Sequence, residues 1–85
     1  MPQTILITGC STGFGKLTAK LFSEKGWNVI ATMRSPEKET ELAKLKNVFV
    51  TQLDVTKIES VKKAVEDGIE KFGTINALVN NAGYG

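Results

Sequence analysis

A glycine-rich run directly after a short apolar segment is the feature that most constrains this chain. Residues 5–7 (Ile-Leu-Ile) are apolar on both faces, which is typical of a buried parallel strand. Residues 8–15 then supply three glycines and lead into a helical pattern. Glycines permit a sharp turn and a close approach of ligand to backbone, and the N–H groups at a helix N-terminus are unpaired and partially positive. This order of elements therefore predicts a cradle for a phosphate group.

The spacing of apolar residues along the rest of the chain predicts alternating strands and helices. The predicted strands are residues 5–7, 27–32, 48–51 and 75–79. The predicted helices run from Phe14 to a cap at Gly26, over a short segment opened by Ser35 as N-cap and Pro36, and from Thr56 to a cap at Gly73. We therefore predict an α/β fold of the order β-α-β-α-β-α-β, a Rossmann-like parallel sheet with strand order 3-2-1-4.

The third predicted helix has the clearest start signal. Thr56 and Glu59 have the spacing of a capping box, in which the threonine hydroxyl and the glutamate carboxylate satisfy backbone donors at the helix start. Its apolar face is predicted to consist of Ile58, Val61, Val65, Ile69 and Phe72.

Composition limits the classes of function that the chain can have. Its 85 residues amount to one small domain, and 11 Lys and Arg against 9 Asp and Glu leave a net charge of +2. Because the basic residues alternate with acidic ones, we expect solvated helix faces and no nucleic-acid partner. No apolar run approaches the roughly 20 residues that cross a bilayer, so we expect no membrane span and a soluble, cytoplasmic protein. Cys10 is the one cysteine, predicted to be a small buried side chain, and no metal site is predicted.

Three nucleotide motifs compete for the glycine run. A P-loop requires G-x-x-x-x-G-K-[S/T], but the first glycine stands one residue too early and Leu17 takes the place of the hydroxyl residue. The fingerprint G-x-G-x-x-G would place Thr18 where the third glycine belongs. The pattern that fits is T-G-x-x-x-G-x-G, read as Thr8, Gly9, Gly13 and Gly15.

Two further motifs accompany this pattern, namely Leu53-Asp54-Val55-Thr56 after the third strand and Asn80-Asn81-Ala82-Gly83 after the fourth. With all three motifs in this order, the chain resembles the short-chain dehydrogenase/reductase family over its entire length. The resemblance implies a Rossmann fold that binds a nicotinamide dinucleotide for hydride transfer at a carbonyl or an alcohol.

The resemblance also implies contacts with the cofactor. The implied positions are Gly9, Ser11, Thr12, Gly13, Phe14, Gly15, Arg34, Asp54, Val55, Asn81, Ala82 and Gly83. Ser11 and Thr12 lie where family members contact the adenosine end, Asp54 and Val55 where they contact adenine, and Asn81 with Ala82 along the ribose. Phe14 replaces the family's branched aliphatic residue, and its ring is expected to pack into the core.

The end of the second strand bears on the choice between NADP(H) and NAD(H). Sites for NAD(H) place an acid there to hold the ribose 2′-hydroxyl, whereas this chain has Met33 followed by Arg34. An acid would repel a 2′-phosphate, while the arginine guanidinium can pair with one. We therefore expect NADP(H) rather than NAD(H), with a solvated loop charge as the other interpretation of Arg34.

The family's catalytic residues are a serine and a Tyr-x-x-x-Lys pair, and no position of this sequence matches them. Tyr84 is the single tyrosine and has no lysine four residues later. We therefore expect the chain to be the N-terminal dinucleotide-binding part of a longer reductase, with residues 75–79 as an exposed edge strand that could self-associate. The alternative is a nucleotide-binding or structural module with no activity of its own.

Overall fold

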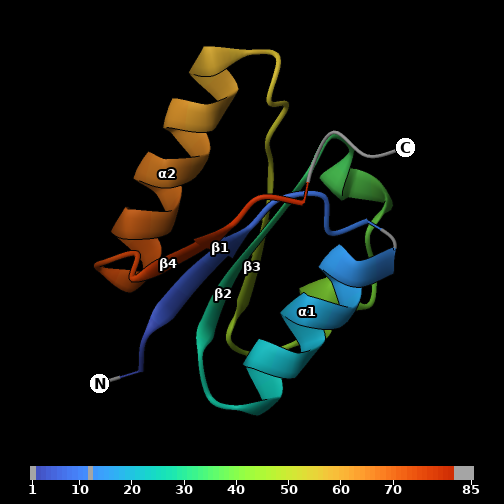
Figure 1. Ribbon diagram of the computed structural model, residues 1–85, viewed down its shortest axis with the longest axis vertical. Helices are drawn as coiled ribbons and strands as arrows, with labels where there is room; N and C mark the ends of the chain where they lie inside the picture. The colour runs from blue at the N-terminus through green and yellow to red at the C-terminus, as the bar shows by residue number, and fades with distance from the viewer. Residues whose placement is uncertain (1, 12, 82–85) are drawn as a thin grey trace.

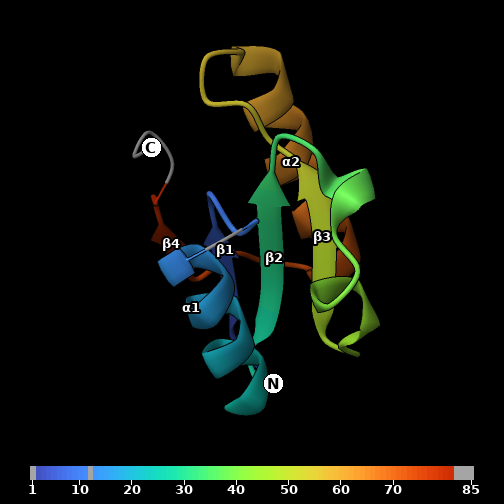
Figure 2. The same ribbon diagram turned by 90° about the vertical axis from the view of Figure 1, so that its right-hand side faces the viewer.

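The computed structural model describes residues 2–11 and 13–81. Four parallel strands form one sheet in the order β3-β2-β1-β4, which confirms the predicted Rossmann-like topology. The strands are β1 (Thr4–Ile7), β2 (Asn28–Met33), β3 (Val48–Gln52) and β4 (Ala77–Val79), and the two α-helices are α1 (Gly13–Glu24) and α2 (Ile58–Phe72). Helix α2 covers one face of the sheet, and α1 lies on the other face together with the segment between β2 and β3 (Figures 1 and 2).

The core divides into two apolar clusters because the central strands are covered on both faces. Alternate residues of β1 and β2 point to opposite sides, so that Ile5 and Ile7 pack with α1, and Leu6 packs with α2. All four residues of β1 are buried, as expected for a strand between two helical layers. Because all the strand pairs are parallel, the carboxyl ends of the strands lie toward one edge of the molecule (Figure 1).

The short helix predicted after Ser35 begins at Pro36 as expected, but it is not a continuous α-helix. The chain instead makes two separate 3-10 turns, η1 (Pro36–Lys38) and η2 (Leu42–Lys44). Ser35 makes no side-chain capping bond. Glu39 has an extended backbone, and its carboxylate accepts a hydrogen bond from the Leu42 N–H at 2.8 Å. This side-chain bond replaces a backbone bond and interrupts the helix after one turn.

The predicted capping box is also wrong, although the predicted helix exists. Helix α2 begins at Ile58 with Lys57 as its N-cap residue. Both the N–H and the hydroxyl of Thr56 donate to Asp54 Oδ1, at 3.0 and 2.6 Å, so the carboxylate holds Thr56 in a turn before the helix. Ser60 closes this turn instead, since its hydroxyl accepts from the Asp54 N–H at 2.8 Å.

The predicted helix ends are confirmed. Gly73 lies in the left-handed region at φ 92°, and its N–H donates to the Ile69 carbonyl at 2.6 Å. Gly26 follows α1 at φ 88°, with its N–H donating to Ser23 at 3.1 Å. Both are glycine caps that few other residues could replace without strain.

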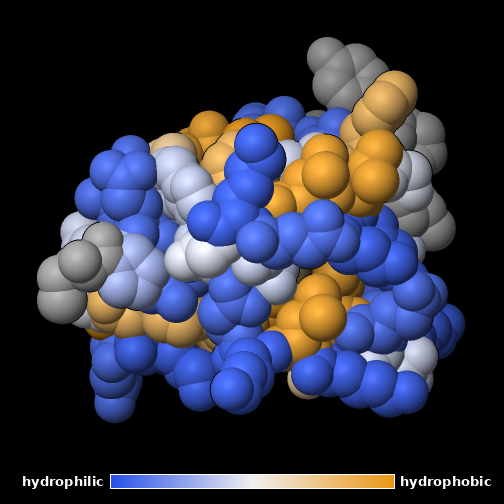
Figure 3. Space-filling view, turned by 90° about the horizontal axis from the view of Figure 1, so that it is seen from below, coloured by the Kyte–Doolittle hydropathy of each residue, from blue (hydrophilic) through white to orange (hydrophobic). Residues whose placement is uncertain are grey.

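Several large apolar side chains lie at the surface. The exposed ones are Phe14, Leu17, Leu21, Val55, Ile58, Ile69 and Leu78. On α2 this corrects the predicted apolar face, because Val61, Val65 and Phe72 pack against the sheet while Ile58 and Ile69 do not. Hydrophobic groups separated by hydrophilic ones are visible on the face seen from below (Figure 3). Neither helix of the described ranges is both long and apolar enough to cross a membrane.

Strand β4 is shorter than the predicted 75–79 segment and pairs with β1. Within residues 2–11 and 13–81 no further strand pairs with its other side. Leu78 is 66% exposed although its register partner Leu6 is buried. The strand therefore presents a partly apolar edge, as the sequence predicts.

Gly68 offers a test of the contact between α2 and the sheet. A Cβ at this position would overlap Cδ1 of the buried Ile30. We expect Gly68→Ala to lower the free energy of unfolding by about 1–2 kcal/mol, because overpacking costs more than the higher helix propensity of alanine returns. Denaturant unfolding measures this change.

Two further variants make that test specific. In an Ile30→Val background, which lacks Cδ1, Gly68→Ala is expected to cost less or to stabilise the protein. Glu66→Ala, on the exposed side of the same helix, is expected to stay within about 0.5 kcal/mol of wild type. A stabilising Gly68→Ala in the wild-type background would contradict the close contact.

Candidate cofactor-binding site

The predicted site residues gather at the carboxyl ends of the four strands. The glycine loop follows β1, Arg34 follows β2, Asp54 comes shortly after β3 and Asn81 shortly after β4. In parallel sheets of this topology the strand order reverses beside strand 1, and the connections from neighbouring strands run to opposite sides of the sheet. Ligands bind in the crevice that opens there, at the carboxyl ends of the strands. Thr12, Ala82 and Gly83 lie outside the described residues, and Ser11 is exposed in the loop.

The glycine loop has a backbone that other residues could not readily adopt. Gly9 and Gly13 have φ values of 66° and 62°, in the left-handed region. A Cβ at Gly15 would overlap the Gly9 carbonyl and would stand 2.9 Å from Asn81 Nδ2. A Cβ at Gly13, in contrast, would meet nothing within 4 Å. The loop is thus tightly packed on its inner side and open at the start of α1, where a diphosphate would meet backbone N–H groups.

Thr8 connects this loop to the segment after β4, a role that the sequence did not reveal. Its N–H donates to the Val79 carbonyl at 3.0 Å, and its hydroxyl accepts from the Asn81 N–H at 2.7 Å. The same hydroxyl lies 3.0 Å from Asn80 Oδ1. The available signal was the position of Thr8 one residue beyond a buried strand, within reach of the end of the neighbouring strand.

Cys10 anchors the loop on its other side. Its N–H donates to the Thr32 carbonyl at 3.0 Å, its thiol donates to the Ile7 carbonyl at 3.2 Å, and the side chain is fully buried. Burial raises the pKa of the Cys10 thiol to about 12. Cys10 is therefore the small buried side chain that the sequence predicts, and it remains a protonated thiol at neutral pH.

Asp54 is oriented by its own turn. The two hydrogen bonds from Thr56 to Oδ1 lower the pKa of the carboxyl below its usual range, and the charges of Arg34 and Lys57 lower it further. Asp54 is consequently ionised at neutral pH, and its Oδ2 makes no hydrogen bond with the described residues. Val55, the next residue, is exposed.

Arg34 lies beside this acid at the next strand end. Its carbonyl accepts from Gln52 Nε2 at 3.2 Å, and one residue earlier the Met33 carbonyl accepts from the Leu53 N–H at 2.9 Å. These bonds tie the backbone at Arg34 to β3, while its side chain is exposed. Within residues 2–11 and 13–81 the guanidinium forms no ion pair, so it can be presented to an anion in solution.

The expectation that the Phe14 ring packs into the core is wrong. Phe14 is 80% exposed, because Gly15 and Ala19 take the inward side of α1. Leu17 and Leu21 continue the exposed side three and seven residues later. Farther along the same helix, Phe22 does pack against the core.

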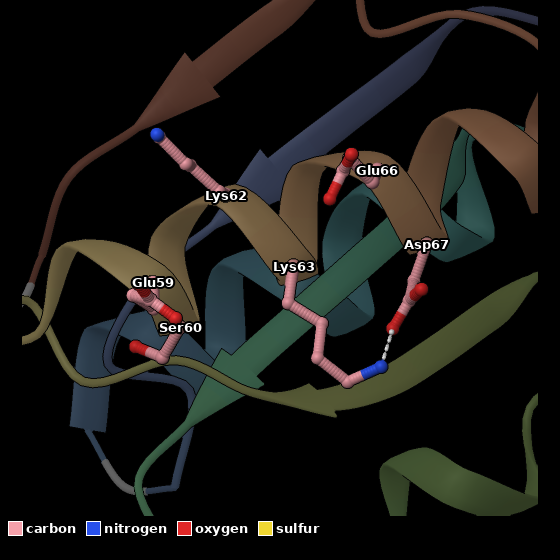
Figure 4. Close-up of a pocket in the computed structure, with 6 residues that line it drawn as sticks. All are labelled: Glu59, Ser60, Lys62, Lys63, Glu66 and Asp67. Carbon is pink, nitrogen blue, oxygen red and sulfur yellow. Dashed lines mark ion pairs between the residues drawn. The ribbon is translucent and has the colours of Figure 1, made fainter.

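A shallow groove on α2 adjoins this site through Ser60, which bonds the backbone of Asp54. It is lined by Glu59, Ser60, Lys62, Lys63, Glu66 and Asp67, all of one helix (Figure 4). Lys63 and Asp67 pair across one turn at 3.3 Å (Figure 4). Side chains of alternating charge on an exposed helix face are typical of a solvated surface, and none of the predicted site residues is among them.

Comparison with known proteins adds to this geometry. The family model described as short chain dehydrogenase matches residues 3–85. The chain belongs to this family. It is 46% identical to 3-ketodihydrosphingosine reductase of Bacteroides thetaiotaomicron, over 99% of this chain and 29% of that protein. Members of the family are oxidoreductases whose Rossmann fold binds nicotinamide cofactors.

Solved structures agree with the fold. The 3-ketoacyl-(acyl-carrier-protein) reductase from Brucella melitensis, complexed with NADH, matches with a TM-score of 0.90 and 35% identity, over 98% of this chain and 35% of that chain. A structure of ElxO with NADPH bound matches with a TM-score of 0.85 and 38% identity, over 99% and 36%. The chain thus spans about a third of the length of the relatives it matches.

The hydroxyl of Thr8 is expected to hold the glycine loop against the end of β4. Thr8→Val keeps the shape but leaves the Asn81 N–H without that acceptor, so we expect the free energy of unfolding to fall by about 1–2 kcal/mol. Thr8→Ser, which keeps the hydroxyl, should lose less than Thr8→Val in the same denaturant titration. Equal stability of Thr8→Val and wild type would show that the bond contributes nothing.

Proposed function

We propose that this chain is the NADP(H)-binding part of a short-chain dehydrogenase/reductase that transfers hydride between the cofactor and an alcohol or carbonyl substrate. The observation that carries the NADP(H) assignment is Arg34 at the end of β2, exposed and with no acid in the preceding position. A 2′-phosphate beside this residue would meet a guanidinium rather than a carboxylate.

Two features of the described residues support a dinucleotide as the ligand. At the diphosphate, the open space beside Gly13 and the unpaired N–H groups at the start of α1 provide donors without a side chain in the way. At the adenosine, Asp54 Oδ2 is available to accept from the adenine amino group. Asn81 would lie along the ribose, with Ala82 and Gly83 following it as the sequence predicts.

When bound, the nicotinamide ring supplies or accepts the hydride. The residues of this chain bind and orient the cofactor, and the acid that protonates the substrate oxygen is expected elsewhere in a longer protein. The relatives' structures with NADH and with NADPH support a nicotinamide cofactor in general. The preference for the phosphorylated form is a proposal based on Arg34.

Removing the Arg34 guanidinium tests the cofactor preference. We expect Arg34→Ala to weaken NADPH binding roughly tenfold or more, because a charge-assisted bond to phosphate is lost, and to leave NADH binding unchanged. Titration calorimetry with each cofactor measures both affinities. Lys46→Ala is the matched control, because it removes the same charge at the start of β3, the opposite end of the strands.

Two results would refute the preference. One is a wild-type chain that binds NADH more tightly than NADPH. The other is an Arg34→Ala variant in which the ratio of the two affinities is the same as in wild type.

The edge of β4 supports a further part of the proposal, namely that the chain by itself associates with a second copy. Leu78 is 66% exposed, and within the described part of the chain the strand pairs on one side alone. In a longer reductase this edge would be covered by the next strand of the sheet, as the family resemblance implies. A cytoplasmic location stays a prediction.

Sedimentation velocity tests the association. We expect the weight-average mass of wild type to rise with concentration and that of Leu78→Lys to stay at the monomer value, since an edge lysine opposes strand pairing. Lys62→Ala, an exposed substitution on α2, serves as the control. A wild type that remains a monomer and unfolds cooperatively would sink this part of the proposal.

A further inference from the structure

Four charged side chains join α1 to the segment between β2 and β3. Lys16 and Lys20 lie on α1, and Glu39 and Glu41 lie between η1 and η2. Lys16 Nζ is 2.9 Å from Glu41 Oε1 and 3.5 Å from Glu39 Oε1, and Lys20 Nζ is 2.8 Å from Glu41 Oε2. We call these four residues the charge cluster.

The charge cluster is anchored in the core through Glu39. The Glu39 side chain is only 4% exposed, and its Oε2 accepts the N–H of Leu42 at 2.8 Å. Leu42 itself is fully buried between the sheet and α1. One oxygen of Glu39 thus faces the lysine of α1, while the other fixes the start of η2.

Both carboxylate oxygens of Glu41 are engaged. The lysine pairs lower the pKa of the Glu41 carboxyl to about 2, with the bond to Lys20 as the main cause and that to Lys16 next. The bond to Glu41 likewise raises the pKa of Lys16. The two lysines and two glutamates have balanced charge, so the cluster adds no net charge beside the crevice.

The location of the charge cluster connects two parts of the candidate site. Lys16 stands one residue after Gly15, at the start of the helix that cradles the diphosphate. The segment that carries Glu39 and Glu41 begins at Arg34 and contains no helix longer than three residues. Within the described residues, the cluster supplies every side-chain hydrogen bond and ion pair between α1 and residues 34–45.

We propose that the charge cluster positions the segment after β2, and with it Arg34, for the 2′-phosphate of NADP(H). The inference rests on the proposed function and deepens it. Lys16, Lys20, Glu39 and Glu41 are positioning residues, because they act through Arg34 rather than by touching the cofactor. The cluster thereby contributes to the choice between NADPH and NADH and not to binding of the diphosphate, which both cofactors share.

Simple electrostatics predicts the opposite result, which makes the proposal testable. Glu41→Gln removes a negative charge near the crevice, so a purely long-range effect would tighten binding of the more anionic NADPH. If the cluster positions Arg34, the same substitution weakens NADPH binding instead.

The experiment measures the affinities of NADPH and NADH by calorimetry for wild type and variants. For Glu41→Gln we expect NADPH binding to weaken about three- to fivefold, the size expected for loss of partly exposed ion pairs, with NADH binding unchanged. Glu41→Asp keeps the charge and is expected to recover part of the loss. Asp67→Asn is the matched control, because it removes the same charge from the Lys63 pair on α2.

Amide hydrogen exchange on the cofactor-free chain gives a second readout. In Glu41→Gln we expect faster exchange at residues 39–45, including the Leu42 N–H, with no change in β1 or α2. This measurement does not depend on which cofactor binds, so it separates the positioning role from the proposed function.

The outcomes are distinguishable. NADPH binding that is unchanged or tighter in Glu41→Gln, or an equal loss for both cofactors, overturns the positioning role. Failure of the proposed function is seen instead in wild type and Arg34→Ala, as an absent preference for NADPH. A wild type that binds neither cofactor overturns both.

Discussion

The close approach of α1 to the glycine loop is the constraint on which the rest of the site depends. Gly15 lies against the Gly9 carbonyl with no space for a side chain, and Asn81 approaches the same point from the end of β4. The glycine loop, the start of α1 and the distant segment after β4 therefore meet at one point. This contact brings the N-terminus of α1 to the carboxyl ends of the strands, where a phosphate can be bound.

Much of the fold could be predicted because its signals are local. Apolar periodicity gives the strands and helices, and glycine caps give the helix ends, as Gly73 illustrates. The segment after Ser35 could not be predicted, since the Glu39 carboxylate competes with the backbone for the Leu42 N–H. The capping box was wrongly predicted for a similar reason, because the Thr56 hydroxyl donates to the nearby Asp54 carboxylate instead of capping the helix.

In the candidate site, too, some features could be predicted from the sequence and others could not. The glycine loop could be predicted because its backbone admits few residue types. Gly9 has a left-handed backbone, and a Cβ at Gly15 would overlap the Gly9 carbonyl. Whether Phe14 is buried or exposed depends on which side of α1 meets the sheet, and the spacing of apolar residues does not show which side that is; in the structure Phe14 is exposed. The charge cluster joins Lys16 to Glu41 across 25 residues of sequence, and nothing local to either residue indicates that pairing.

In the proposed site, backbone groups recognise one part of the cofactor and a side chain recognises another. The diphosphate is common to both nicotinamide cofactors and would meet backbone N–H groups, whose placement follows from the fold itself. The 2′-phosphate distinguishes the cofactors and would meet Arg34, on a segment that the fold leaves without regular helix. The backbone at Arg34 is bonded to β3, but the residues that follow it need further contacts to be held in place. The charge cluster supplies contacts of this kind, so the preference for one cofactor can change by substitution there without altering the cradle.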